Sequence, residues 1–137
     1  MMADDQGCRA SSPECVMVED VDELYRRILP QWTKIEDGKR VVSSGAFHSH
    51  TDPEPSVDLA RLTSPAESLK GYPDHELAGF FARSARLLGL DVVHTPYPEY
   101  DPDNYAHCLI KGLDSLSGNG KKKAAKDLAR SCHFVAF

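Results

Sequence analysis

The chain has 137 residues, of which 41% are hydrophobic and 27% charged, values typical of a single globular domain. Its formal net charge of −5 argues against general affinity for nucleic acids or anionic membranes. Residues 1–20 lack the apolar core of a signal peptide, and no apolar run is long enough to span a bilayer. We therefore expect a cytoplasmic protein without membrane association.

The cysteine spacing excludes two common kinds of site. Cys8, Cys15, Cys108 and Cys132 include no CxxC pair, so neither a zinc knuckle nor a thioredoxin-like redox motif is indicated. In the reducing compartment that we expect, Cys108 and Cys132 should be buried thiols rather than a disulfide.

The N-terminal region predicts a disordered segment followed by a helix. Residues 1–16 are acidic and lack periodicity, which favours disorder, whereas residues 17–137 should form one domain. Apolar residues recur at helical spacing from Val21 to Ile28. Asp20 is a suitable N-cap and Pro30 would end the helix.

A hairpin and a short helix are expected next. The turn dipeptide Asp37-Gly38 separates extended patterns at Trp32 to Glu36 and Arg40 to Phe47, as in a β-hairpin. Ser64-Pro65-Ala66-Glu67 has the pattern of a capping box with proline at the first helical position. A short helix should follow it.

The remaining elements alternate between helix and strand. We expect a helix from Pro73 to Leu88 ended by Gly89, strands at Leu90 to Thr95 and Ala106 to Lys111, a helix with the apolar stripe Ala124 to Cys132, and a terminal strand at His133 to Phe137. This order predicts a single α+β domain in which a small mixed sheet of three to five strands packs against three to four helices.

The densest group of candidate metal ligands follows Phe47. His48 and His50 are two residues apart, so on a strand both imidazoles would lie on one face and bind one metal ion. Asp52 or Asp58 would complete a zinc site that keeps one position for water. Zinc is the one cofactor for which the sequence offers ligands, and the other interpretation of this segment is a polar loop without metal.

His48-Ser49-His50 followed by Ser56-Val57-Asp58 resembles the signature of the JAMM (MPN) metalloproteases. The resemblance implies a zinc-dependent hydrolase of isopeptide bonds. His48, His50 and Asp58 would be the ligands and Ser56 would support the oxyanion. Five residues separate His50 from Ser56, where the family has seven, so zinc hydrolysis is an alternative hypothesis.

Tyrosines and acids alternate in the proline-rich segment between the two internal predicted strands. The candidates for contact with a protein partner are Tyr97, Tyr100, Tyr105, His94 and His107. Tyrosines on a stiff loop give contact area at low entropic cost. The other interpretation is that they pack back over the edge of the domain. His94 and His107 lie on neighbouring predicted strands, where they would act as an acid–base or metal-binding pair or as core residues.

Four lysines near the start of the last predicted helix suit an anion. Lys121, Lys122, Lys123 and Lys126 follow a glycine-rich turn. Cations are unfavourable at the positive end of a helix, and a bound phosphate or nucleic-acid backbone would relieve this repulsion. The spacing differs from that of a P-loop, and the other interpretation is a solvated helix face.

The chain over residues 22–137 also resembles a group of small uncharacterised bacterial proteins. The segments that carry the resemblance are Val41 to Phe47, Ser56 to Leu62 and Asn104 to His107. It implies a bacterial, cytoplasmic protein and no established activity. Because the sequence lacks a complete catalytic constellation, the leading hypothesis is a non-catalytic interaction or accessory protein of a multi-protein system, with an unidentified partner. Zinc-dependent hydrolysis and anion or nucleic-acid binding are the alternatives.

Overall fold

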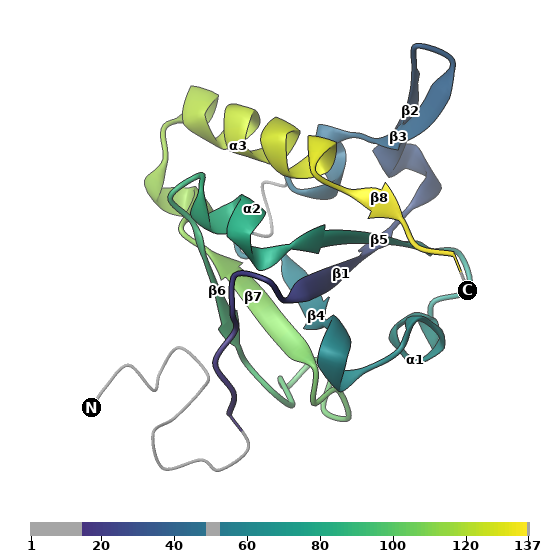
Figure 1. Cartoon of the computed structure of the whole chain (residues 1–137), viewed down its shortest axis with the longest axis vertical. Coiled ribbons are helices and arrows are strands. Elements are labelled where there is room, and N and C mark those ends of the chain that lie inside the picture. Colours follow the sequence, from purple (N-terminus) through teal and green to yellow (C-terminus); the bar gives the residue numbers. More distant parts are fainter. Residues whose placement is uncertain (1–14, 49–52, 137) are drawn as a thin grey trace.

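The computed structural model describes residues 15–48 and 53–136, which form a six-stranded sheet, a two-stranded hairpin and three α-helices (Figure 1). The strand order of the main sheet is β6-β7-β4-β1-β5-β8. Its strands are β1 (Glu23–Ile28), β4 (Ser56–Leu59), β5 (Glu76–Phe81), β6 (Asp91–His94), β7 (His107–Lys111) and β8 (His133–Phe134). The α-helices are α1 (Pro65–Leu69), α2 (Ala82–Arg86) and α3 (Gly118–Arg130). Short 3-10 turns are η2 (Pro30–Trp32), η3 (Ser44–Ala46), η4 (Ala60–Leu62) and η5 (Leu113–Ser115).

The α+β class predicted from the sequence is confirmed, but the predicted sheet is wrong. All strand pairs among the described residues are antiparallel, and the main sheet has six strands rather than three to five. None of the helices in the described residues is long and apolar enough to cross a membrane.

The hydrophobic core lies between one face of the sheet and α3. Leu24 and Ile28 of β1 and Val57 of β4 join a buried cluster with Ala125 and Leu128 of α3. In Figure 1, α3 lies above the strands of the sheet and α1 below them. The opposite face of the sheet is therefore covered by α1 and by loops. On this face the central strands carry polar side chains.

The predicted helix from Val21 to Ile28 is wrong, because this segment is the central strand β1. Leu24 and Ile28 are fully buried and lie four residues apart, a spacing that puts two side chains on one face of either a helix or a strand. Pairing with β4 on one side and β5 on the other decides the conformation. Such pairing depends on distant sequence and overrides local spacing.

The predicted helix from Pro73 to Leu88 is also wrong over most of its length. Residues Glu76–Phe81 form β5, and only Ala82–Arg86 are helical. Leu77 to Phe80 are all buried, because both faces of β5 are covered, and a continuous apolar run does not distinguish a strand from a helix. Gly89 has a φ of +83° and closes the turn after α2, in agreement with its predicted role as a terminator.

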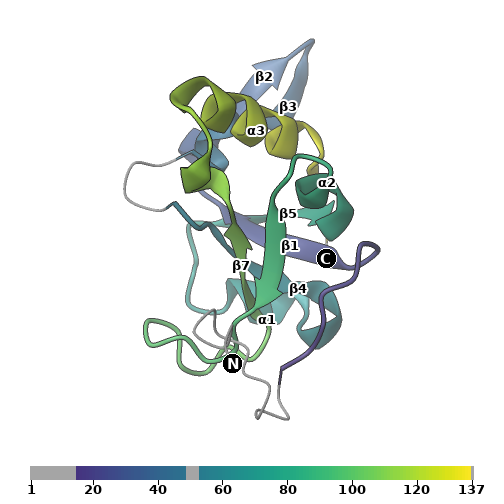
Figure 2. The ribbon, with the colours of Figure 1, turned by 90° about the vertical axis from the view of Figure 1, so that its left-hand side faces the viewer.

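Several local predictions are confirmed. The hairpin consists of β2 (Thr33–Glu36) and β3 (Lys39–Val42), joined by Asp37 and Gly38 with φ of 53° and 78°, and it projects beyond α3 in a second view of the molecule (Figure 2). Ser64 caps α1 by accepting the Glu67 amide at 3.1 Å. The strands expected around His94 and His107 are β6 and β7, the last predicted helix is α3, and β8 follows it.

The strand predicted up to Phe47 ends earlier, at Val42. The backbone then forms η3, and Ala46 and Phe47 are buried in the core beneath α3. His48 therefore follows a turn and a loop rather than a strand. The prediction of disorder for residues 1–16 falls mostly outside the described residues.

Candidate functional site

Polar side chains from three neighbouring strands meet on the face of the sheet opposite α3. Asp58 of β4 is paired with Tyr25 of β1 on one side and with His107 of β7 on the other. Side chains of residues paired across a sheet, and of residues two apart on a strand, share a face. Arg27 and Ser56 are two residues from Tyr25 and Asp58, so both join this polar face.

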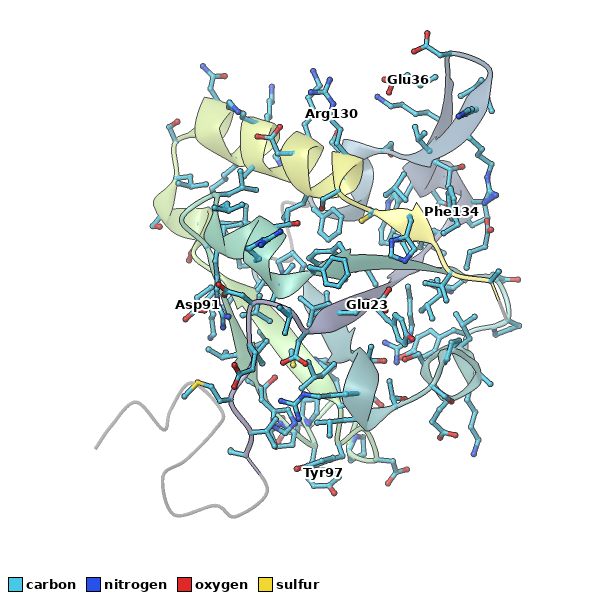
Figure 3. All side chains as sticks on the ribbon, viewed as in Figure 1. Glu23, Glu36, Asp91, Tyr97, Arg130 and Phe134 are labelled. Carbon is cyan, nitrogen blue, oxygen red and sulfur yellow. The ribbon has the colours of Figure 1, made fainter. Side chains whose placement is uncertain are left out.

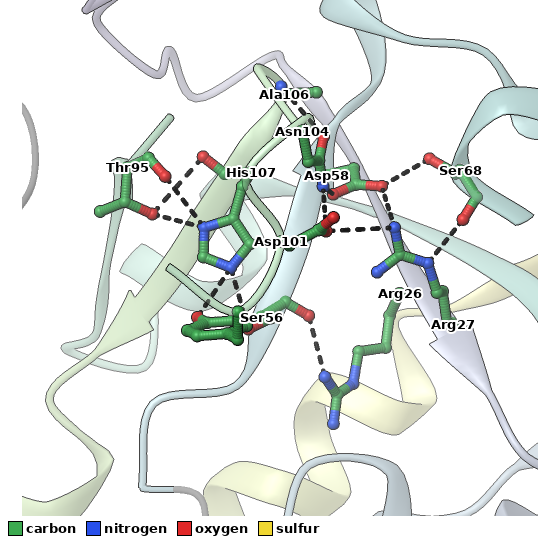
Figure 4. A network of polar contacts seen from close by, with 11 residues as sticks. Arg26, Arg27, Ser56, Asp58, Ser68, Thr95, Asp101, Asn104, Ala106 and His107 are labelled. Atoms are coloured by element: carbon green, nitrogen blue, oxygen red, sulfur yellow. Dashed lines mark hydrogen bonds and ion pairs between the residues drawn. The ribbon is translucent and has the colours of Figure 1, made fainter. Parts of the chain in front are cut away.

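Asp58 is the centre of one group of hydrogen bonds. Its side chain is 3% exposed, and its Oδ2 atom accepts from Arg27 Nη2 at 3.1 Å and from Ser68 Oγ at 2.6 Å. Its Oδ1 atom accepts from Asn104 Nδ2 at 2.8 Å (Figure 4). One carboxylate thus binds strand β1, helix α1 and the loop before β7. These three donors compensate the cost of burying its charge.

Arg27 completes this group and lies at its solvent side. Its guanidinium donates to the Ser68 carbonyl, stands 3.9 Å from Asp101 Oδ2 and lies 4.1 Å from the centre of the Tyr72 ring. A planar guanidinium suits both the paired donors and the aromatic face. The Arg27 side chain is 18% exposed, so one edge of the group faces water.

His107 is the centre of a second group, and its tautomer follows from its partners. Its Nδ1 atom lies 3.0 Å from the Thr95 carbonyl oxygen, which only accepts, and 2.7 Å from Thr95 Oγ1, which can accept or donate. We assign the proton to Nδ1 because only an Nδ1–H group can bond to the carbonyl. The Nε2 atom then holds a lone pair. It faces Ser56 Oγ at 3.0 Å (Figure 4). Tyr100 Oη also lies 3.0 Å from this nitrogen.

The surroundings of His107 favour the neutral imidazole. Burial lowers the pKa of His107, and this effect exceeds the opposing effects of the Thr95 carbonyl, Asp58 and Asp101. Arg27 lowers the pKa further. A neutral ring with a fixed Nδ1–H is a hydrogen-bond acceptor at Nε2 and has the protonation state of a general base.

The loop of residues 96–103, which we call the tyrosine loop, borders both groups. Asn104 at its end anchors it, because Asn104 donates to Asp58 and to Asp101 Oδ2 and accepts the Tyr97 amide at 3.0 Å. Tyr97 has a φ of 56°, a conformation that L-residues rarely adopt. Tyr97 and Tyr100 are 46% and 69% exposed.

A hollow of about 270 Å³ lies beside the loop and shares Arg27 and Asn104 with the Asp58 group. Its other charged lining residues are the acids Glu67, Asp101 and Asp103 and the base Lys70. Acids thus outnumber free bases here, since the Arg27 guanidinium is already paired with Asp58.

The described residues include only two of the four predicted metal ligands, His48 and Asp58. His48 is half-buried after η3, while His50 and Asp52 lie outside the described residues. Both oxygens of Asp58 are occupied by donors. Within residues 15–48 and 53–136, no group of three or more His, Cys, Asp and Glu side chains has the geometry to hold a metal ion. Zinc binding stays a prediction.

The two histidines expected to form a cross-strand pair lie on opposite faces of the sheet. His94 is paired with Cys108, so its side chain shares the face of Cys108 and not that of His107. His94 accepts the Val16 amide at Nδ1 and donates from Nε2 to the Tyr105 carbonyl. Both histidines are 1% exposed, which leaves Tyr97 and Tyr100 as the exposed members of the predicted partner-binding set.

The four lysines lie on α3, with Lys121, Lys122 and Lys123 in its first two turns and Lys126 beyond them. Ser117 caps this helix by accepting the Gly120 amide at 3.0 Å, and Lys123 forms an ion pair with Asp127 at 2.8 Å. Lys122, Lys123 and Lys126 are exposed, and Lys121 is half-buried. Anion binding stays a prediction. Tyr97 and Arg130, near the end of α3, lie at opposite ends of the molecule (Figure 3).

The sequence did not indicate that Ser56 and His107 would meet, nor that Arg27, Ser68 and Asn104 would surround Asp58. Fifty-one residues separate Ser56 from His107, and 31 separate Arg27 from Asp58. The only signal was indirect: two of the segments that carry the resemblance to small bacterial proteins contain Ser56, Asp58, Asn104 and His107.

The chain matches no model of a known protein family, no curated protein and no solved structure. The resemblance to small bacterial proteins therefore stays a prediction, as does the partial likeness to the JAMM metalloproteases.

Proposed function

We propose that this protein is an interaction protein that binds a basic segment of a partner protein through the tyrosine loop. The observation that carries the proposal is the exposure of Tyr97 and Tyr100 on a loop whose backbone is tied to the buried Asp58 group. Exposed aromatic side chains at a fixed position are the residues that dominate binding energy at protein interfaces.

The order of the loop supports binding at low entropic cost. The Asp101 amide donates to the Pro98 carbonyl at 2.9 Å, and the Asn104 amide donates to the Asp101 carbonyl at 3.1 Å. Together with the Asn104 side-chain bonds, these contacts hold the loop in one conformation before any partner arrives. A surface ordered in advance loses less freedom when it binds.

The charge of the loop supports a basic partner. Glu99 and Asp103 are exposed beside the tyrosines, and Glu67 lines the adjoining hollow. A lysine or arginine side chain pairs with a carboxylate and also stacks over a tyrosine ring. An acidic partner would be repelled by the same carboxylates.

Binding of short fluorescent peptides, measured by anisotropy at low salt, tests this proposal. We expect a peptide of alternating Lys and Ser to bind, a peptide of alternating Glu and Ser not to bind, and the affinity to fall with added salt because exposed charges are screened. Tyr97→Ala should weaken binding about tenfold, as expected for an aromatic anchor. Combined Glu99→Gln and Asp103→Asn substitutions should weaken it as well.

Phe81→Ala is the matched control. Phe81 is 50% exposed, close to the 46% of Tyr97, but it lies on β5, away from the tyrosine loop. The control should bind the basic peptide with unchanged affinity. Absence of binding to any basic peptide, or equal losses in the Tyr97 and Phe81 variants, would contradict the proposal.

A further inference from the structure

Ser56 differs in the partner of its hydroxyl from Ser68, Ser115 and Ser131, whose hydroxyls donate to carboxylate or carbonyl oxygens. Ser68 Oγ donates to the Asp58 carboxylate, Ser115 Oγ to the Gly112 carbonyl and Ser131 Oγ to the Leu128 carbonyl. Ser56 Oγ instead lies 3.0 Å from the unprotonated Nε2 atom of His107. A hydroxyl beside an imidazole lone pair can lose its proton to the ring as it attacks an electrophile.

His107 is oriented as a base for this hydroxyl. The Nδ1–H bond to the Thr95 carbonyl fixes both the tautomer and the direction of the ring, and Thr95 Oγ1 lies 2.7 Å from the same nitrogen. In hydrolases with a nucleophilic serine, a third group orients the base in this way. Here a backbone carbonyl and a threonine hydroxyl occupy the place that a carboxylate takes in such triads.

We propose that Ser56 is a nucleophile, with His107 as its general base, and that it takes an acyl group from a carboxylic ester. Ser56 is half-buried and is hydrogen-bonded to the exposed Tyr100, so a small ester can reach it from the loop side of the sheet. This activity does not require binding of a partner to the tyrosine loop, although Tyr100 contributes to both sites.

The reaction balances with these groups and water alone. Ser56 Oγ forms a bond to the carbonyl carbon while its proton moves to His107 Nε2. The ester C–O bond then breaks, and the leaving alkoxide takes the proton from Nε2. In the second half, water attacks the acyl-serine, His107 accepts its proton, and Ser56 leaves with that proton while the carboxylic acid is released.

Tyr100 competes for the same lone pair. Its hydroxyl lies 3.0 Å from His107 Nε2 and 3.3 Å from Ser56 Oγ, and one lone pair accepts one strong hydrogen bond. Whenever Tyr100 donates to Nε2, the Ser56 proton has no base. Because the Tyr100 ring is 69% exposed, it can turn into water and leave Nε2 to Ser56. Tyr100 thus competes with Ser56 for the base, and its removal should speed the reaction.

The charged groups around His107 come from three elements. Asp58 on β4 and Asp101 in the loop raise the pKa of His107, whereas burial and Arg27 on β1 lower it, and the net shift is downward. The ring is therefore mostly neutral at pH 7, and the rate of acylation should rise with pH through a value below 6.5 and then level off.

The test uses a biotinylated fluorophosphonate, which forms an Oγ–P bond as fluoride leaves and the serine proton passes to His107. We expect one adduct per chain by intact mass spectrometry and its location at Ser56 by peptide mapping. Ser56→Ala should abolish it and Ser115→Ala should leave it unchanged. His107→Asn keeps a donor toward Thr95 but has no base, so the labelling rate should fall at least about 100-fold. Tyr100→Phe should raise the rate.

Esterase activity on p-nitrophenyl acetate, with loss of turnover in Ser56→Ala, should accompany the labelling. The proposal is overturned if Ser56 remains unlabelled, or if folded His107→Asn is labelled at the wild-type rate. If His107→Asn does not fold, the pH dependence of the labelling rate of the wild-type chain still tests whether His107 is the base. A labelling rate that keeps rising tenfold per pH unit up to pH 9, without a plateau, would show that hydroxide and not His107 activates the hydroxyl.

Discussion

Asp58 and His107 are directly paired across strands β4 and β7, yet their side chains belong to separate hydrogen-bond groups. The Asp58 carboxylate accepts from Arg27, Ser68 and Asn104, whereas the His107 ring is bonded to Thr95, Ser56 and Tyr100. Asp58 therefore affects His107 only through its charge. Its direct role is to join β1, β4 and α1.

The first prediction concerns this role. Asp58→Asn should lower the free energy of unfolding by about 2–3 kcal/mol, measured by urea denaturation at pH 7. The substitution leaves the Arg27 guanidinium without its close counter-charge. The loss should be less than the full cost of a broken buried pair, because Arg27 is 18% exposed and retains Asp101 at 3.9 Å.

Asp127→Asn is the matched control for that measurement. Asp127 also accepts from a cation, Lys123 at 2.8 Å, but on the exposed surface of α3. Its substitution should leave the urea midpoint unchanged, since surface ion pairs contribute little. Equal midpoints for the Asp58 and Asp127 variants would show that the Asp58 group does not stabilise the fold.

The second prediction is that the protein loses stability as pH falls from 7.5 to 5.5. Burial lowers the pKa of His75, His94 and His107. A lowered folded-state pKa means that the unfolded chain binds more protons below about pH 6.5, so protonation favours unfolding. Urea midpoints across this range should fall with pH, and the slope should be smaller in His94→Gln. A flat or rising profile would contradict the expected burial of these rings.

The third prediction concerns the thiols. Burial raises the pKa of Cys132 to about 12 and raises that of Cys108 still further. Thiolate is the reactive form, so neither should react at pH 8 in the folded protein. Iodoacetamide followed by peptide mass spectrometry should find both unmodified without urea and both modified in urea. Rapid modification of Cys108 in the folded state would mean that the core around this strand opens locally.

The fourth prediction concerns the hairpin turn. Gly38 has a φ of 78°, and Gly38→Ala should cost about 1 kcal/mol because an L-side chain is strained there. Gly118→Ala at the start of α3 is the control: a Cβ at Gly118 meets nothing within 4 Å and its φ is ordinary, so stability should be unchanged or slightly higher. Urea denaturation measures both, and equal effects would contradict the strain.

Local chemistry accounts for the elements that could be predicted from the sequence. The Asp37-Gly38 turn, the Ser64 cap and the stripe of α3 each act within a few residues, and each formed as expected. The strands β1 and β5 could not be predicted in this way. Their pairing with a strand on each side depends on partners far along the chain, and their apolar spacing fits a helix equally well.

The candidate site could be predicted only in its composition. Ser56 and Asp58 were named from the likeness to the JAMM signature, and His107 as an acid–base, metal-binding or core residue of an apolar strand. The register of β4 against β7 decides which of them meet. A shift of one residue would turn His107 toward the core and away from Ser56. Tyr97 and Tyr100 were predicted as candidate anchors for a partner because they stand on a stiff, proline-rich loop, with packing over the domain edge as the alternative.

The Asp58 group has a consequence for screening. Asp58 is 31 residues from Arg27 and 46 residues from Asn104, so the three come together only when β4 has paired with β1 and β7. A compound that contacts this face binds the native chain and not the unfolded one, and it must raise the melting temperature of the entire protein. Thermal-shift screening can therefore find ligands of this face before any activity is known.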